Sequence, residues 1–299
     1  MKKIIDISRY QAPDLINYDK LSKQIDGVIL RIGVTGYGTG ESLNKDTTFD
    51  KHYSEFKKRG VPIGGYYYSC ANEPGEGKRE AEFVYNIIKG KTFELPIYWD
   101  SEDQYHQKKM TKEQLSKVGK EFLDFLEDKG YYVGIYASAS WFKNELDMNM
   151  LANYDVWVAH YGVDKPSYER YGMWQYTDSG RLDGYNGNLD MNYMYKDYPT
   201  IIKNAGLNGF KKQTVTSQVK SEKNYNGFRK QNGSVVYFRE SGTQAYKWQF
   251  IKGSWYYFRP KTGTMVTGFQ YIDKNWRYFD NLGRYFGDAI IKNKKDYRD

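Results

Sequence analysis

The sequence predicts an α/β barrel followed by a small all-β repeat region. Over residues 1–205, short apolar runs alternate with longer amphipathic stretches, as strands and helices do in an α/β fold. Farther on, a Tyr-Phe pair recurs at Tyr237, Tyr257 and Tyr278, and a glycine follows each pair. A period of about twenty residues is typical of short units that stack on one another. The 299-residue chain has room for one large domain and one small one.

Eight short apolar runs are the expected strands of the barrel. The clearest helices are expected at 75–89 and 111–129, and the second begins with Thr111 and Gln114, the pattern of a capping box. Alternation of strands and helices over ~200 residues favours an irregular, TIM-like β/α barrel, which carries its active site at the carboxyl ends of the strands. The predicted strands are 3–7, 28–33, 62–68, 95–100, 132–137, 156–161, 173–176 and 189–191.

Charge divides the chain into two parts. Residues 1–205 carry 27 basic and 30 acidic side chains, whereas the chain from Gly206 onward carries 18 basic and 7 acidic ones. The net charge of +8 therefore comes from the second part, and the two parts are expected to have different partners. The stretch 211–223 is polar and has no apolar periodicity. We predict a domain at 1–205, a linker at 206–224 and a repeat domain at 225–299.

Composition excludes several classes of protein. Hydrophobic residues make up 39% and charged residues 27% of the chain, which excludes global disorder. No run approaches the ~20 apolar residues of a membrane span, and no apolar leader follows the first lysines. The single cysteine, Cys70, excludes a disulfide framework, and three histidines leave little for a zinc enzyme. We expect neither a metal nor a cofactor.

Acidic residues follow three separate apolar strands. Asp6 ends the first strand, Asp100 and Glu102 follow the fourth, and Asp190 lies in the last. Alternate residues of a strand share a face, so Asp100 and Glu102 are expected to point the same way. Carboxyl groups that crowd together raise one another's pKa, and a retained proton suits general acid catalysis. Paired carboxylates without histidine or cysteine partners favour glycoside cleavage; the alternative is that each acid caps a following helix.

The first 205 residues resemble the family 25 glycoside hydrolases, the Chalaropsis-type lysozymes that act as 1,4-β-N-acetylmuramidases. The resemblance lies in seven motifs that follow one another in the family's order across the whole domain. Two stretches depart from the family pattern, namely 31–36 after the second strand and 67–69 after the third, and both concern contacts on the substrate side. The matching motifs are 5–11, 64–68, 96–102, 134–137, 157–161, 174–176 and 190–192.

This resemblance implies a role for each acidic residue. Glu102 falls on the proton donor, and Asp100 on the group that stabilises the oxocarbenium-like centre or orients the 2-acetamido group of the substrate. Asp6 and Asp190 fall on acids that line the cleft. Whether water attacks directly or after an acetamido-derived intermediate stays open. The implied substrate-binding residues, for which barrel packing is the alternative, are Tyr66, Tyr136, Trp157, Trp174 and Asn192.

The C-terminal part resembles the choline-binding or cell-wall-binding repeats of Gram-positive surface proteins. The motif carrying this resemblance is 252–268, in which a hairpin turn at Lys252 and Gly253 precedes Trp-Tyr-Tyr-Phe. In that family, aromatic cages hold choline by cation–π attraction. Phe269 replaces the usual tryptophan here, and Arg277 stands where a cage tyrosine is expected, so its guanidinium would repel choline. The implied wall-binding residues are Trp248, Trp255, Tyr257, Trp276 and Tyr278; inter-hairpin packing is the alternative.

These features together predict a modular lytic enzyme of the bacterial cell wall. The barrel is expected to cleave the β-1,4 bond between N-acetylmuramic acid and N-acetylglucosamine, and the basic repeats to bind anionic wall polymers or choline-like groups. We expect no nucleic acid partner and no membrane insertion. Without an export signal, the chain is expected to accumulate in a host cytoplasm as phage endolysins do, with secretion by another route as the alternative. Rival hypotheses are a non-catalytic wall-binding protein and a glycosidase for another N-acetylated glycan.

Overall fold

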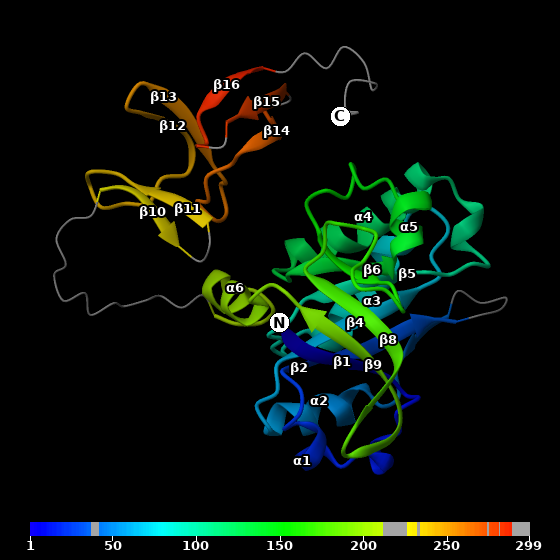
Figure 1. The fold of residues 1–299 in the computed structure, drawn as a ribbon. Coiled ribbons are helices and arrows are strands. Elements are labelled where there is room, and N and C mark those ends of the chain that lie inside the picture. The colour runs from blue at the N-terminus through cyan, green and yellow to red at the C-terminus, as the bar shows by residue number, and fades with distance from the viewer. Residues whose placement is uncertain (37–41, 212–225, 232–233, 274, 281, 289–299) are drawn as a thin grey trace. The chain divides into compact units, whose positions relative to one another are not determined.

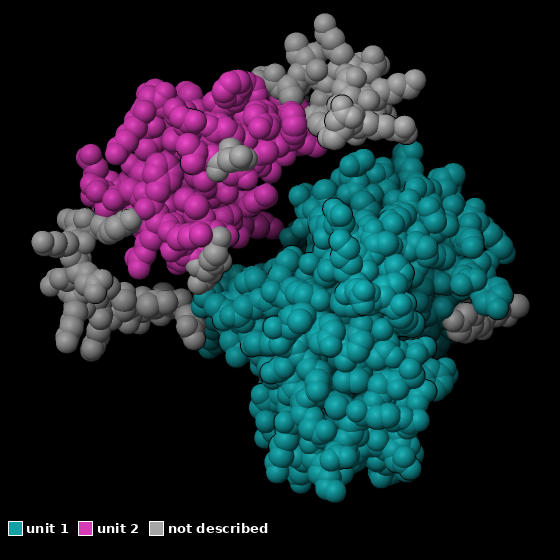
Figure 2. All heavy atoms as spheres, in the orientation of Figure 1, with its two compact units in different colours: residues 1–213 teal, residues 214–299 magenta. Residues whose placement is uncertain are grey.

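The structure is a computed structural model that describes residues 1–36, 42–211, 226–231, 234–273, 275–280 and 282–288. The chain divides into two compact units, residues 1–213 and residues 214–299 (Figure 2). Each unit has its own hydrophobic core. Within the described residues, no helix is both long enough and apolar enough to cross a bilayer.

Eight strands of the first unit close into a barrel (Figure 1). Each strand pairs with its neighbour around the ring, and pairing of the first two strands closes it. Seven of the strands run parallel, and the eighth is antiparallel to both of its neighbours. The predicted barrel and all eight predicted strands are confirmed. They are β1 (Lys2–Ile7), β2 (Gly27–Thr35), β4 (Ile63–Ser69), β5 (Ile97–Ser101), β6 (Val133–Ser138), β7 (Asp155–Ala159), β8 (Met173–Leu182) and β9 (Tyr185–Met194), with β3 (Leu43–Lys45) added beside β2.

Helices connect the strands and cover the barrel. The helix α4 begins as the sequence predicts, because the Thr111 side chain accepts from the Gln114 backbone N–H and the Gln114 side chain accepts from the Thr111 N–H. Its buried residues recur at helical spacing and face the strands. The helices are α1 (Tyr18–Leu21), α2 (Phe49–Lys58), α3 (Glu76–Ile88), α4 (Lys112–Asp128), α5 (Ala139–Asn144) and α6 (Tyr198–Ala205), with short 3-10 turns η1 (Pro13–Leu15) and η2 (Gln107–Lys109).

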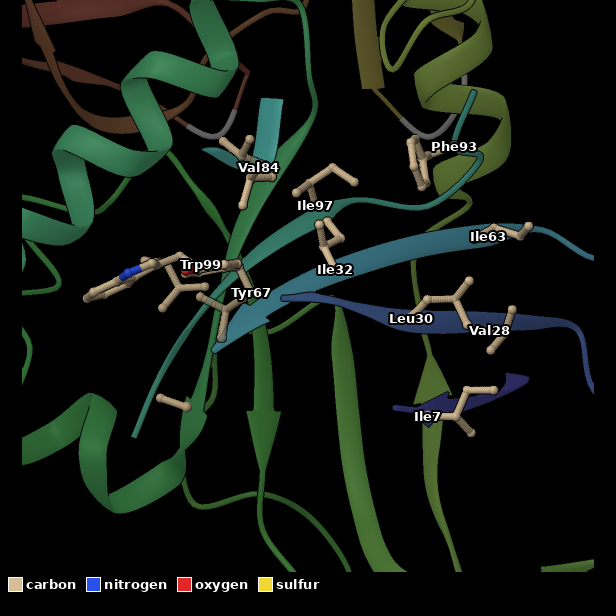
Figure 3. Packing of buried hydrophobic residues seen from close by; sticks show 14 of the residues in the cluster. Ile7, Val28, Leu30, Ile32, Ile63, Tyr67, Val84, Phe93, Ile97 and Trp99 are labelled. Carbon is tan, nitrogen blue, oxygen red and sulfur yellow. The ribbon is translucent and has the colours of Figure 1, made fainter. Parts of the chain in front are cut away.

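Side-chain alternation along the strands separates two cores. On β5, Trp99 packs outward among the helices, whereas Tyr98 packs inside the barrel. Figure 3 shows part of the outer core, with Val84 of α3 on the same side of the strands as Ile97. Because Asp100 has the same parity as Tyr98, the strand directs this carboxyl group to the interior. The barrel interior is therefore apolar near the strand starts and polar near their carboxyl ends.

The barrel extends beyond the predicted boundary at residue 205. Asn208 is fully buried; its side chain accepts from the Tyr132 backbone N–H at 2.6 Å and donates to the Leu95 carbonyl at 2.9 Å. Phe210 packs against the inner core together with α6. The predicted linker at 206–224 thus begins too early, because residues 206–211 satisfy backbone groups of the barrel. Residues 212–224 lie outside the described part of the chain.

The second unit consists of the predicted hairpins. The turn at Lys252 and Gly253 has positive φ at both residues, 47° and 82°, as a tight two-residue hairpin turn requires. Aromatic residues of successive hairpins contact one another, which confirms the predicted stacking. The ring centres of Phe228 and Tyr256 are 5.0 Å apart, and those of Trp248 and Phe279 are 5.7 Å apart. The strands are β10 (Gly227–Gln231), β11 (Ser234–Phe238), β12 (Lys247–Ile251), β13 (Ser254–Phe258), β14 (Gly268–Ile272), β15 (Asn275–Phe279) and β16 (Tyr285–Asp288).

Helix α4 lies unusually close to β5 at Gly119. A Cβ atom at this position would lie 2.5 Å from the ring of the buried Trp99. Although alanine favours a helix over glycine by ~1 kcal/mol, this collision dominates. We expect Gly119→Ala to lower the free energy of unfolding by about 1–3 kcal/mol in denaturant titrations. Lys117→Ala, on the exposed face of the same helix, should change it by less than ~0.5 kcal/mol; an unchanged Gly119→Ala protein would contradict the close approach.

Candidate active site

Four carboxyl groups meet at the carboxyl ends of the barrel strands. Asp6 lies on β1, Asp190 on β9 and Asp100 on β5, while Glu102 follows β5 directly. Asp6 and Asp190 are direct partners in the antiparallel pairing of β1 and β9. All four side chains line one cavity of about 550 Å³. The structure thus brings together every acidic residue that the sequence singled out.

Asp6 is held by two amide side chains. The Gln175 Nε2 donates to its Oδ2 at 2.9 Å, and the Asn192 Nδ2 donates to the same oxygen at 2.8 Å. Asn192 is completely buried and also accepts from the Trp157 indole at 2.7 Å. Because Asn192 does not line the cavity, the structure gives it a positioning role and places it away from the predicted substrate contact.

Burial and mutual repulsion raise the pKa of the clustered carboxyl groups. Burial, with a smaller effect of the nearby Asp6 charge, raises the pKa of Glu102 to about 7. The same causes raise the pKa of Asp190 to about 8, and burial raises that of Asp6 to about 6. Burial followed by the charges of Glu102 and Asp6 raises the pKa of Asp100 well above its usual value. The cluster therefore retains protons near neutral pH.

One carboxylate oxygen of Asp100 is buried without a hydrogen-bond partner among the described residues. The Asp100 side chain is 3% exposed, and its Oδ1 makes no hydrogen bond to any described residue. An unpaired polar atom in a buried position costs free energy and is uncommon in folded proteins. Asp100 also lines the cavity. Its Oδ1 is fully enclosed, so the unpaired atom adds to the free-energy cost of burying this carboxyl group.

Three of the four predicted aromatic residues line the cavity. Tyr66, Tyr136 and Trp157 do so, with the Tyr136 and Trp157 rings 4.4 Å apart. The structure places Trp174 elsewhere: its indole donates to the His160 carbonyl at 2.8 Å and packs beside Tyr193, outside the cavity. For Trp174, the packing alternative is therefore favoured. Gln175, the next residue in the chain, points into the cavity instead, as strand alternation requires.

Several cavity residues were not singled out from the sequence. Gln175 accepts hydrogen bonds from the Tyr136 and Tyr161 hydroxyls at 2.7 and 2.5 Å while it donates to Asp6. Arg31 lies 5.2 Å from the centre of the Tyr10 ring and is paired with a buried carboxylate. Strand parity was the available signal, because Arg31 shares the inward parity of Ile29 on β2 and Gln175 shares that of Met173 on β8.

A second cavity of about 430 Å³ adjoins the first. It shares Glu102, Tyr136 and Tyr161 with the first cavity, and Lys143 and His160 belong to its other lining residues. Among the described residues that line these two cavities, Glu102 is the one carboxyl group common to both. This side chain therefore stands at the junction of the two spaces, of which the first also contains the other three acids.

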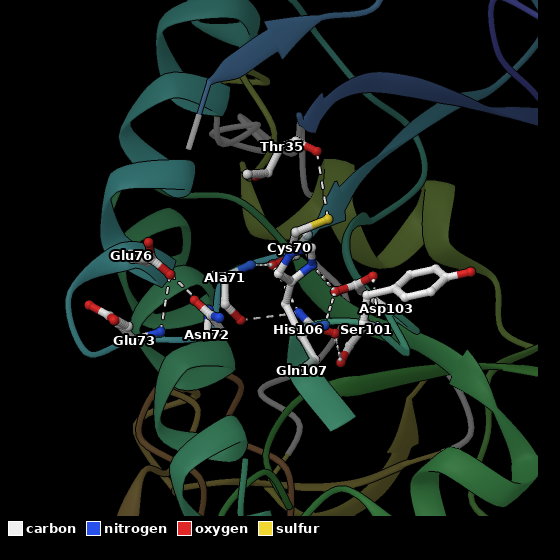
Figure 4. A network of polar contacts seen from close by, with 12 residues as sticks. Thr35, Cys70, Ala71, Asn72, Glu73, Glu76, Ser101, Asp103, His106 and Gln107 are labelled. Carbon is white, nitrogen blue, oxygen red and sulfur yellow. Dashed lines mark hydrogen bonds and ion pairs between the residues drawn. The ribbon is translucent and has the colours of Figure 1, made fainter. Parts of the chain in front are cut away.

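A buried hydrogen-bond chain supports β5 on its outer side (Figure 4). Ser101, between the two acids, donates to Gln107 at 3.0 Å and accepts from the Trp141 indole at 3.1 Å. Gln107 in turn donates to Ser69 at 3.2 Å and to the Ala71 carbonyl at 3.4 Å. All four polar side chains of this chain, those of Ser69, Ser101, Gln107 and Trp141, are less than a tenth exposed. The chain fixes the end of β5, and with it the direction of the acids on either side of Ser101.

Among the residues that the structure describes, one group of side chains has the spacing of a metal site. Cys70, Asp103 and His106 each bring one ligand atom within 4.8 Å of the others. Asp103 already accepts from the backbone N–H groups of Tyr105 and His106 and from the His106 ring at 2.7 Å (Figure 4). These hydrogen bonds show that Asp103 caps the turn at residues 103–106. Both of its carboxylate oxygens already have partners, so the group is explained by the turn without a metal ion.

The predicted wall-binding residues fall into two environments. Trp248 and Tyr257 are half-buried partners across the β12–β13 hairpin and pack on the core of the third hairpin. Trp255, Trp276 and Tyr278 are 47%, 43% and 36% exposed. The packing alternative therefore describes the first pair, and the exposed residues are available to a ligand.

A β/α barrel with four carboxyl groups and aromatic rings around one cavity at the carboxyl ends of its strands has the fold and site of a glycoside hydrolase. Comparison with known proteins gives the family. Residues 5–185 match the glycosyl hydrolases of family 25, and residues 225–267 match the choline-binding repeat. The chain belongs to glycosyl hydrolase family 25.

Its relatives include lytic enzymes. The autolytic lysozyme of Clostridium acetobutylicum is 33% identical over 147 residues, which cover 49% of this chain and 43% of the lysozyme, less than half of its length. The CTP1L endolysin is similar in structure, with a TM-score of 0.59 and 26% identity over 69% of this chain and 70% of its own. The modular autolysin LytC of Streptococcus pneumoniae, solved with a synthetic peptidoglycan ligand, has a TM-score of 0.56 and 26% identity over 64% of this chain and 46% of its own.

The acidic cluster should destabilise the barrel as pH rises. The unfolded carboxyl groups ionise near pH 4, whereas the folded ones hold protons up to about pH 6–8, so unfolding releases protons and the free energy of unfolding falls across this range. We expect Asp100→Asn to raise the free energy of unfolding by about 1–3 kcal/mol at pH 8 and by less at pH 4.5. Calorimetry of the barrel transition measures this. Glu113→Gln, at an exposed position, is the matched control. If the increase in unfolding free energy caused by Asp100→Asn did not grow with pH, this would contradict the repulsion between the buried carboxyl groups.

Proposed function

We propose that the protein is a peptidoglycan hydrolase that cleaves the β-1,4 bond between N-acetylmuramic acid and N-acetylglucosamine. The observation that carries the proposal is the position of Glu102, a carboxyl group with a pKa near 7 at the junction of two cavities. A glycosidic oxygen at this junction has one sugar on either side. The lysozyme relative and the peptidoglycan complex of LytC support the choice of substrate.

In this proposal Glu102 is the general acid. Its raised pKa keeps the side chain protonated up to about pH 7, so it can transfer a proton to the glycosidic oxygen as the bond breaks. The second cavity, which Glu102 alone of the acids borders, receives the departing sugar. The first cavity, with the other three acids, receives the sugar on which positive charge develops.

Asp100 acts on the positively charged sugar. Its carboxyl group, which lines the cavity, accepts the N–H of the 2-acetamido group, and this hydrogen bond favours the ionised carboxylate. The ionised Asp100 then stabilises the oxocarbenium-like centre or directs the acetamido oxygen towards it. Asp6 and Asp190 are positioned to tune the charge of this pair, with Asp6 held in place by Gln175 and Asn192. Tyr66 and Tyr136 present ring surface to the sugars, while the buried Trp157 packs against Tyr136.

The hairpin unit tethers the enzyme to the wall. Its exposed aromatic residues and its excess of basic side chains suit a surface rich in sugars and anionic polymers. A tether raises the effective concentration of substrate around the barrel without a change in the chemistry. The match to choline-binding repeats supports this division of roles.

Glu102→Gln should remove the transferable proton and keep the shape of the site. We expect turnover of peptidoglycan to fall ~100- to 10,000-fold with wall binding unchanged. The wild-type rate should decline as pH rises through about 7, because Glu102 then loses its proton. Release of soluble fragments from purified walls measures both effects. Near-normal activity in Glu102→Gln would exclude this residue as the acid, and Glu113→Gln serves as the exposed control.

The products decide between the substrate hypotheses. Borohydride reduction labels new reducing ends, and mass spectrometry identifies the labelled sugar. Reduced N-acetylmuramic acid is the expected result. Reduced N-acetylglucosamine would retain the hydrolase and overturn the proposed bond, whereas binding without cleavage on several walls would favour a non-catalytic wall-binding protein.

The tether and the barrel can be separated by truncation. A protein ending at Gln213 keeps Asn208 and should cleave small soluble fragments normally while it sediments less with walls. A protein ending at Ala205 lacks the Asn208 hydrogen bonds and should be less stable by about 2–4 kcal/mol. Sedimentation, activity on fragments and thermal unfolding of both proteins test this. Equal wall affinity of the full chain and the 1–213 protein would refute the tether, and equal stability of the two truncations would refute the role of Asn208.

A further inference from the structure

We infer that the aromatic site between the second and third hairpins is occupied by the chain's own cation, the guanidinium of Arg277, and that this residue excludes choline from the repeat unit. The inference deepens the proposed tether by assigning a determinant of its ligand specificity. Its geometric basis does not depend on whether the tether operates on walls.

The guanidinium lies against two aromatic rings. The Arg277 Cζ is 5.0 Å from the centre of the Trp248 ring and 5.8 Å from that of the Tyr285 ring. These distances are within the ~6 Å at which a cation is attracted to a ring face. The Trp248 and Tyr285 rings are themselves 5.4 Å apart and nearly perpendicular, so they form two walls of one site. A guanidinium in such a site satisfies the attraction that a quaternary ammonium would otherwise supply.

Both sides of this contact are held by the turn of the third hairpin. The Arg277 Nε donates to the Ile272 carbonyl at 3.1 Å, and the Trp248 indole donates to Asp273 at 2.9 Å. Ile272 and Asp273 are adjacent in the chain, so one turn fixes the cation and the ring that receives it. The arrangement is therefore built into the hairpin contact, and Arg277 is only half exposed.

Comparison of the two hairpin contacts shows what Arg277 replaces. In the first contact, Tyr256 lies 5.0 Å from Phe228. In the second contact, Trp248 stands twenty residues after Phe228 and Arg277 stands twenty-one residues after Tyr256, and their separation is again 5.0 Å. The planar guanidinium thus takes the place of a tyrosine ring. Tyr256 itself is 8% exposed, so the first contact is closed by an aromatic ring and the second by a cation.

The test measures choline binding by the full-length protein. Choline chloride is titrated by calorimetry and by tryptophan fluorescence, with sodium chloride at equal ionic strength as the blank. Wild-type protein should show no saturable binding. Arg277→Ala and Arg277→Thr both vacate the site, the second with a residue that favours strands. Each should show saturable choline binding that wild type lacks, at least ~10-fold above any wild-type signal, since each ring contact with a cation contributes ~0.5–2 kcal/mol. Arg277→Lys keeps a cation there and is the matched control that should remain without choline.

The outcomes separate cleanly. Saturable choline binding by wild type, or no gain in either folded variant, would overturn the inference. Thermal unfolding establishes that the variants are folded, and Arg277→Thr decides the question if Arg277→Ala unfolds. Wall sedimentation of the wild-type protein is measured in parallel. Its failure would count against the tether, while the titration with soluble choline would still test the role of Arg277.

Discussion

The active site depends on the enclosure of like charges within a closed barrel. A strand whose side chains alternate in direction must send every second residue inside, and eight strands in a ring send those residues to one axis. Near the strand starts this interior is filled by Ile4, Leu95 and Tyr98. Near the carboxyl ends it receives Asp6, Asp100 and Asp190, which cannot all ionise at little cost in so small a space. The proton that the proposed acid catalysis requires is therefore a consequence of the geometry, and the barrel loses stability by keeping it.

The surroundings of the cluster are organised to hold this unfavourable arrangement. Inside the barrel, Gln175 and Asn192 donate hydrogen bonds to Asp6. These hydrogen bonds lower the pKa of Asp6 and so oppose the increase that burial causes. Outside the barrel, Ser101 is hydrogen-bonded to Gln107 and Trp141. These contacts fix the backbone between Asp100 and Glu102, and with it the direction of both side chains. Asp100 is the member with an unsatisfied oxygen. The contrast between a hydrogen-bonded Asp6 and an Asp100 with one unpaired oxygen shows which acid is buried at the higher cost.

Sequence patterns were sufficient for the barrel strands, helix α4 and the acids, because each depends on local alternation or capping. For example, the alternation of side chains along the five residues of β5 is enough to direct Asp100 to the barrel interior. Contacts between distant segments could not be obtained in this way. Nothing near Asn208 indicates that its amide closes the barrel beside Leu95, more than a hundred residues away. Trp174 and Gln175 are a different case, because strand alternation sends these neighbours to opposite sides and the inward Met173 gives the cavity side to Gln175.

The buried Asn208 bears on how chains of this kind exchange their parts in evolution. A recombination point directly after α6 would separate the barrel from the amide that satisfies the Tyr132 N–H and the Leu95 carbonyl. The recipient barrel would then inherit two unsatisfied backbone groups together with its new partner. Crossovers after Phe210 leave these hydrogen bonds intact. The heritable unit of the hydrolase thus ends several residues beyond its last helix, and a binding module can be replaced without damage only from that point onward.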